Sequence, residues 1–89
     1  MKKERWEKLT KREQLLNIGA ELMRAKVWQG KNQEKFLSAI ERALQLIDLS
    51  LSDERWKNNL LMILRLREEL AKFYTSKRTD DISILYRAL

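Results

Sequence analysis

The chain has no proline among its 89 residues and only two glycines, Gly19 and Gly30. Proline and glycine are the residues that most strongly interrupt a helix, so most of this chain lacks a built-in breaker. Its apolar residues recur at steps of three and four, which is the period of helices with one buried face. The sequence therefore predicts an all-α fold, a small antiparallel helical bundle of three long helices plus a short C-terminal helix.

Capping residues set the expected bounds of the first two helices. Thr10 and Glu13 fit a capping box, in which each side chain bonds a free backbone N–H, so the first long helix is expected to begin there. Gly30 suits the left-handed position just beyond the end of that helix. Asn32 is the expected N-cap of the second helix, which should end before a connection at residues 49–52.

The later helices are marked in the same way. Ser52 is a good N-cap for a third helix over residues 53–74, and Thr79 is one for the short final helix. Short connections make successive helices pack antiparallel. We expect a single helical-bundle domain over residues 10–89, preceded by a basic N-terminal arm of residues 1–9 that either adds a helical turn or is irregular.

Histidine and cysteine are absent from the chain. Their absence removes the commonest general base, the commonest metal ligand and every thiolate site. The two isolated glycines cannot form a phosphate-cradling loop, and no pair of carboxylates has the spacing of an acid–base couple. We therefore expect no catalytic, cofactor-binding or metal site, and no enzymatic activity.

Apolar runs are short throughout the chain. The longest runs only from Leu60 to Leu64, whereas a membrane-spanning helix needs about 20 apolar residues. The first residues are charged and are not followed by the apolar core of a secretory signal. We therefore expect a cytoplasmic protein with no membrane partner.

The first long helix carries more apolar surface than one buried face requires. Its apolar side chains spread over roughly 220° of the helical wheel, beyond the ~100° stripe of a one-sided helix. Either this is a central helix packed on several sides, or part of it meets another chain. The third helix has a second apolar edge of the same kind. The candidate interface residues are Leu16, Ala20, Met23, Val27, Trp28, Leu61 and Met62.

Two side chains fall on the unexpected side of their helical wheels. Trp28 lies among polar residues, and it either folds back over the loop at Gly30 or stands exposed as an anchor for a partner. Arg67 lies inside the apolar stripe of the third helix. It either extends its charge out to solvent or pairs with a carboxylate such as Asp48 or Asp81.

The stretch from Ile18-Gly19 to Ala43-Leu44 resembles one hairpin of a tetratricopeptide repeat, beginning with the apolar-glycine pair of that family. The resemblance implies an antiparallel helix pair that binds peptides or proteins. It departs from the family pattern at three points. Lys31 stands where a small residue is expected, the terminal proline is absent, and no second copy follows at a spacing of about 34 residues.

The principal functional hypothesis is a protein–protein interaction module. We expect its partner to be a second copy of itself, most simply in a homodimer, because a core this small gains stability from oligomerisation. A related alternative is an accessory subunit that acts only with a separate partner protein, and the sequence does not distinguish the two.

Nucleic-acid binding is an alternative from a different class. The net charge is +6, and residues 1–12 supply +4 of it from six basic and two acidic side chains. Trp6, which lies among these charges, would then stack on a base. The candidate nucleic-acid contacts are Lys2, Lys3, Arg5, Lys8, Lys11 and Arg12.

Overall fold

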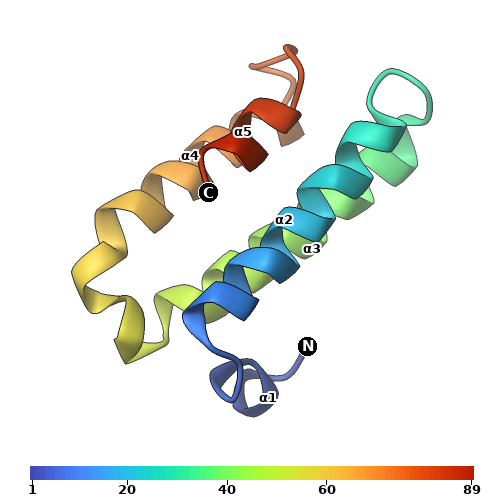
Figure 1. Cartoon of the computed structure of the whole chain (residues 1–89). Coiled ribbons are helices and arrows are strands. Elements are labelled where there is room, and N and C mark those ends of the chain that lie inside the picture. The colour runs from blue at the N-terminus through green and yellow to red at the C-terminus, as the bar shows by residue number, and fades with distance from the viewer.

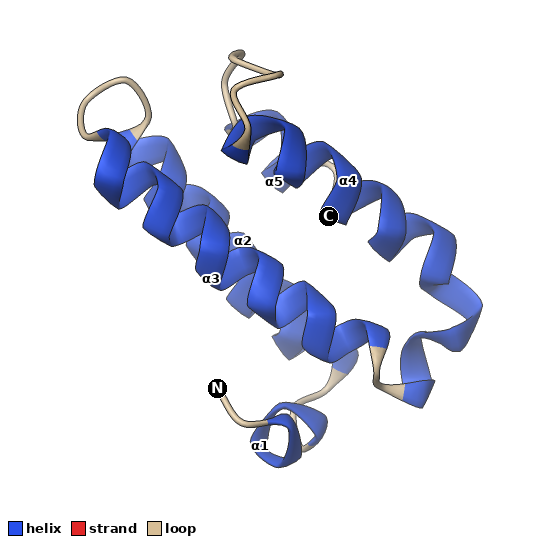
Figure 2. Cartoon of the chain, turned by 180° about the vertical axis from the view of Figure 1, so that it is seen from behind, coloured by secondary structure: helices blue, strands red, loops and turns tan.

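The computed structural model describes all 89 residues and contains helices but no strands (Figures 1 and 2). The predicted all-α class is confirmed, with three long helices packed together and a short C-terminal helix. None of the helices has the length and hydropathy that crossing a bilayer requires. The elements are α1 (Lys3–Glu7), α2 (Lys11–Trp28), α3 (Gln33–Leu51), the 3₁₀-helix η1 (Glu54–Asn59), α4 (Leu60–Tyr74) and α5 (Ser83–Arg87).

Helices α2 and α3 form an antiparallel hairpin, and they lie side by side along their whole length (Figure 1). The predicted capping box is confirmed, because the Glu13 N–H donates to the Thr10 hydroxyl at 3.1 Å and the Thr10 N–H donates to the Glu13 carboxylate at 2.9 Å. Gly30 has a φ of 76°, as its position beyond the helix end predicts. The Asn32 side chain accepts from the backbone N–H of Lys35 at 3.1 Å and caps α3.

The prediction of one continuous third helix over residues 53–74 is wrong for its first residues. Helix α3 continues to Leu51, and the predicted cap Ser52 instead donates to a carbonyl at the end of α3. The next segment begins at Asp53, whose carboxylate accepts from the Arg55 N–H at 3.0 Å. This segment winds as the tighter 3₁₀-helix η1, and α4 starts only at Leu60.

The predicted cap of the final helix is also wrong. Helix α5 begins at Ser83 rather than after Thr79, and the carboxylate of Asp81 accepts from the Ser83 N–H at 2.9 Å. The chain before α5 is held by the end of α2 instead. The Gln29 amide donates to the Asp80 carbonyl at 2.7 Å, and its oxygen accepts from the Ile82 N–H at 2.9 Å.

The predicted N-terminal arm forms the short helix α1, which lies across one end of the α2–α3 hairpin (Figure 1). Of the two forms considered for residues 1–9, the chain adopts the helical turn. Trp6 is fully buried and belongs to the apolar core, which draws side chains from every helix. Burial of this large ring fixes α1 on the rest of the molecule.

A buried polar cluster lies beneath α1 and η1. The Gln14 side-chain amide donates to the Trp6 carbonyl at 2.9 Å and to the Asp53 carboxylate at 3.1 Å. Its oxygen accepts from the Trp56 indole N–H at 2.5 Å. This hydrogen bond helps hold Trp56 of η1 in the core a few residues after α3 ends. No buried side-chain nitrogen or oxygen lacks a partner.

Candidate protein-interaction surfaces

Four of the five candidate residues of α2 lie on its solvent-facing side. Leu16 is 59% exposed and Val27 is 53% exposed, and Ala20 and Met23 between them are exposed as well. Their spacing of four, three and four residues aligns them along one line of the helix surface. We call these four residues the α2 ridge. The opposite side of α2 packs into the core through Ile18, Leu22 and Ala25.

The other predicted interface residues do not join the α2 ridge. Leu61, which is 65% exposed, and Met62 lie on α4, and α5 packs between α4 and α2. Trp28 is half-buried against the core at the end of the hairpin, and the Lys35 ammonium lies 4.1 Å from its ring centroid. Of the two roles considered for Trp28, the structure therefore has the one in which it folds back on its own chain.

Helix α5 sits close to α2 because residue 19 is glycine. A Cβ atom at Gly19 would lie only 2.9 Å from the ring of Tyr86 and 3.3 Å from the Leu89 side chain. The absence of a side chain at this position therefore allows the direct contact of α5 with α2. The opposite side of α5 faces α4.

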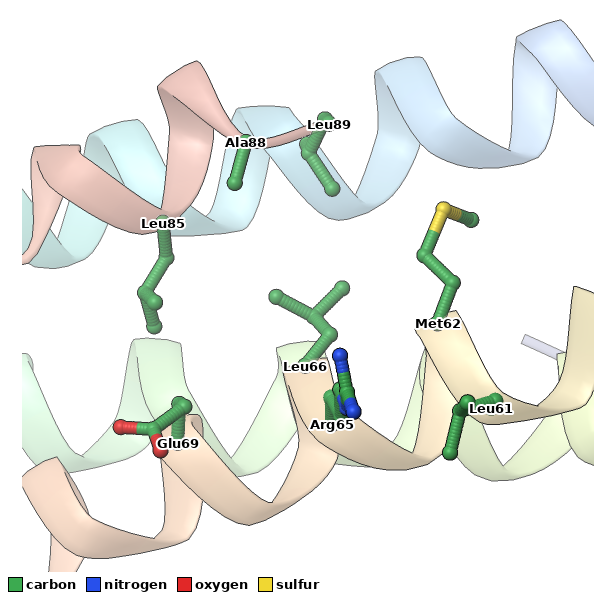
Figure 3. A pocket seen from close by; sticks show the side chains of 8 residues that line it. All are labelled: Leu61, Met62, Arg65, Leu66, Glu69, Leu85, Ala88 and Leu89. Carbon is green, nitrogen blue, oxygen red and sulfur yellow. The ribbon is translucent and has the colours of Figure 1, made fainter.

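A groove of about 380 Å³ runs between α4 and α5. Met62 and Leu66 of α4 point across it toward the side chains of α5 (Figure 3). Its lining is mostly apolar. Because two helices form its walls, a helical wheel drawn for either helix alone does not reveal the groove. The lining residues are Leu61, Met62, Arg65, Leu66, Glu69, Leu85, Ala88 and Leu89.

A second hollow, of about 270 Å³, opens on the other side of Leu89. It is lined by the first turns of α2, by one residue of α5 and by Leu89, which lies just beyond α5. Leu89 therefore stands between two apolar hollows, one facing α4 and one facing α2. The lining residues of the second hollow are Arg12, Leu15, Leu16, Tyr86 and Leu89.

The unpaired charge around the two hollows is positive. Arg12 and Arg65 line one hollow each, and neither forms an ion pair. Glu69, the acidic residue of the groove, accepts from Lys72 at 2.9 Å and from Arg78 at 2.8 Å. The hydrogen bond from Lys72, the larger of these two effects, lowers the pKa of the Glu69 carboxyl. The Glu69 charge is thus already compensated within the chain.

The predicted nucleic-acid contacts are only partly available at the surface. The Lys11 ammonium donates to the Asn59 side chain at 2.6 Å and lies 4.6 Å from the Trp56 ring centroid. Lys3 pairs with Glu7 at 3.9 Å. The proposed stacking role of Trp6 is wrong, because its ring is buried. Four of the predicted contacts remain exposed without an ion pair, and these are Lys2, Arg5, Lys8 and Arg12.

Arg67 pairs with Asp48, one of the two carboxylates considered for it, at 2.7 Å. This pair joins α4 to α3. Glu21 plays a similar part between α2 and α3, because its nearly buried carboxylate accepts from Arg42 at 2.8 Å and also from Arg24. Both ion pairs bridge two helices of the bundle, and neither lies in one of the hollows.

The remaining acidic side chains form no group of three that could hold a metal ion. No family model, curated protein or solved structure matches the chain. The α2 ridge and the two hollows around Leu89 are the candidate interaction surfaces of the chain.

Proposed function

We propose that this chain is a non-enzymatic protein-interaction module that self-associates through the α2 ridge. The observation that carries the proposal is the exposed line of Leu16, Ala20, Met23 and Val27 on a helix whose other side is fully packed. Exposed apolar side chains are ordinary when they are scattered. Four in register along one helix form the kind of seam on which a second helix packs.

The spacing of the ridge is self-complementary. When two copies of α2 pack antiparallel about a two-fold axis, Leu16 of one faces Val27 of the other, and Ala20 faces Met23. Each layer then pairs a larger side chain with a smaller one, which favours even packing. Sliding one helix by a heptad leaves only two of the four apolar layers in contact, so the pattern supports one register.

The exposed area supports a small interface. Helix α2 presents only the four α2 ridge side chains to a second copy, which fits the smaller, transient class of interface. We therefore expect association at micromolar concentrations rather than an obligate dimer.

Sedimentation equilibrium or light scattering over a range of micromolar concentrations tests this proposal. We expect the mass to rise with concentration from 10.7 kDa toward twice that value. A constant mass of 10.7 kDa over the whole range would remove the proposal.

Nucleic-acid binding is the second candidate, and exposed Lys2, Arg5, Lys8 and Arg12 are what support it. A gel-shift assay with generic DNA and RNA at low salt tests it, because contacts to phosphates are strongest there. Absence of a shift at low salt would eliminate it. An accessory role beside a separate protein is tested by co-purification.

A further inference from the structure

Helix α5 packs beside α2 and α4 as the fourth helix of the bundle, but it is much shorter than they are. Helix α4 has 15 residues and α5 has five, which correspond to lengths of about 22 Å and about 8 Å. The bond between Lys11 and Asn59 places the first turns of α2 and α4 close together. The two hollows open beside these turns, on either side of the Leu89 side chain (Figure 3).

The walls of this open position are apolar on both sides. Leu61 and Met62 are exposed on α4, while Leu15 and Leu16 lie on α2. Helix α5 itself shows what the position accepts. Its Leu85 points toward α4 (Figure 3), and its Tyr86 ring packs against Gly19 of α2. A helix that continued along the line of α5 would present side chains to the same two walls.

The charge at the open position selects among such helices. Arg12 on one wall and Arg65 on the other have no acidic partner, and Glu69 is compensated by Lys72 and Arg78. A helix with acidic residues along its edges would supply the missing partners, whereas a basic one would be repelled. Helix α5, the element of this chain that already lies at this position, carries Arg87 and no acidic side chain, so the α5 of a second copy would not supply these partners.

We propose that an amphipathic helix of a separate partner protein, apolar on one face and acidic along its edges, docks over the hollows on either side of Leu89. Its leucine-type side chains enter the two hollows, and its carboxylates bond Arg12 and Arg65. This surface shares only Leu16 with the α2 ridge, so the inference does not depend on self-association.

A peptide of defined design tests the inference on the full chain. The probe is a capped, fluorescein-labelled peptide of about four helical turns, with leucine at every third or fourth position and glutamate along the edges. We expect a saturable rise in fluorescence anisotropy at micromolar protein. A second peptide with lysine in place of each glutamate should bind at least about tenfold more weakly.

Charge reversal in the protein provides the sharper measurement. The double variant Arg12→Glu/Arg65→Glu should lose the glutamate peptide and gain the lysine peptide, which reverses the preference. The matched control Arg5→Glu/Lys77→Glu makes the same change in net charge at exposed residues outside the hollows, and it should keep the preference. Circular dichroism checks that each variant is folded.

Three results would overturn the inference. They are no saturable binding of the glutamate peptide, equal binding of both peptides, and a double variant with unchanged preference. The variant Met62→Glu distinguishes a failure of this inference from a failure of the proposed function. If it leaves self-association intact while no peptide binds, the inference fails and the proposed function stands. Peptide binding by a strict monomer would instead support the inference and remove self-association.

Discussion

The indole N–H of Trp6 donates a hydrogen bond of 3.2 Å to the hydroxyl of Ser50, which lies 44 residues further along the chain. Both side chains are fully buried, and the bond joins α1 to the last turns of α3. The N-terminal segment is therefore part of the folded body, although its sequence is the most basic of the chain.

Replacing Trp6 with alanine should strongly destabilise the protein. The Trp6→Ala variant loses the largest class of core side chain and leaves a cavity under α1, which typically costs about 3–5 kcal/mol. Urea denaturation followed by circular dichroism measures the free energy of unfolding. The exposed neighbour change Lys2→Ala is the control and should shift it by less than about 0.5 kcal/mol. A similar small effect from Trp6→Ala would show that α1 is not docked as described.

Acid should weaken the protein partly through Asp53. Hydrogen bonds from Arg55, the largest effect, and from Gln14 hold the pKa of this nearly buried carboxyl well below its usual value. A lowered folded-state pKa stabilises the fold above the unfolded pKa of about 3.9, and the gain is lost as the pH falls from there.

The variant Asp53→Asn should therefore be less stable than the wild type at neutral pH, and the difference should shrink steadily below about pH 4. Urea midpoints at neutral and acidic pH measure this. The exposed neighbour Glu54→Gln serves as control, with little change expected at neutral pH. A difference between wild type and Asp53→Asn that stays constant with pH would contradict the assignment.

The two glycines should respond differently to alanine. Gly30 has open space around it but a positive φ, so Gly30→Ala should cost about 1–2 kcal/mol. Gly19 lies inside a helix, where alanine gains about 1 kcal/mol, but a Cβ there meets Tyr86. We expect Gly19→Ala to leave stability nearly unchanged, because the gain in propensity offsets the displacement of the ring.

A double-mutant cycle isolates the contact between Gly19 and α5. In a Tyr86→Ala background the ring is gone, so adding Gly19→Ala should stabilise the protein by up to about 1 kcal/mol. Hydrogen exchange of the amides at residues 83–87 should become faster in the single variant Gly19→Ala. Equal effects of Gly19→Ala in both backgrounds would mean that the ring does not restrict this site.

A charge at Met23 should weaken self-association, whereas a charge at Leu64 should not. Met23→Glu puts a charge into the centre of the α2 ridge and should weaken association by about tenfold or more. Leu64→Glu makes the same kind of change at an exposed apolar residue of α4 that lines neither hollow. This control should leave association unchanged, and equal effects of the two variants in sedimentation would place the interface elsewhere.

Added salt should change the strength of self-association and of nucleic-acid binding in opposite directions. Two copies that each carry +6 repel one another, so screening by salt should strengthen self-association through an apolar ridge. Binding to nucleic acid should weaken as salt increases, because it releases counterions. Sedimentation and gel-shift measurements at low and high salt check both directions on the same preparation.

The parts of the fold that the sequence predicts correctly depend on neighbouring residues. Thr10, Gly30 and Asn32 act within one turn of their own positions, and all three lie as expected. Ser52 and Thr79 are wrong as caps because distant residues determine those turns. Gln14 holds the start of η1 from 39 residues away, and Gln29 holds the segment before α5 from more than 50 residues away.

The two kinds of interaction surface also differ in how far the sequence predicts them. The alignment of the α2 ridge residues follows from the periodicity of one helix. Whether they are packed by other helices or exposed is left open by the sequence, and the structure shows them exposed. The hollows around Leu89 depend on where α5 ends and on how closely it approaches Gly19. Leu15 and Leu66 line those hollows, and no pattern within a single helix distinguishes them from ordinary core residues.

The buried Gln14 amide has a consequence for how α2 can align with the rest of the bundle. Apolar side chains alone tolerate a helix that slides by one turn, about 5.4 Å, since one apolar contact replaces another. Such a shift would carry Gln14 away from Trp6, Asp53 and Trp56 at once. It would leave the Trp56 indole N–H and the Gln14 amide without these partners in the core, at about 1–3 kcal/mol for each group. The hydrogen bonds of Gln14 thus select one alignment of α2 among several that apolar packing alone would permit.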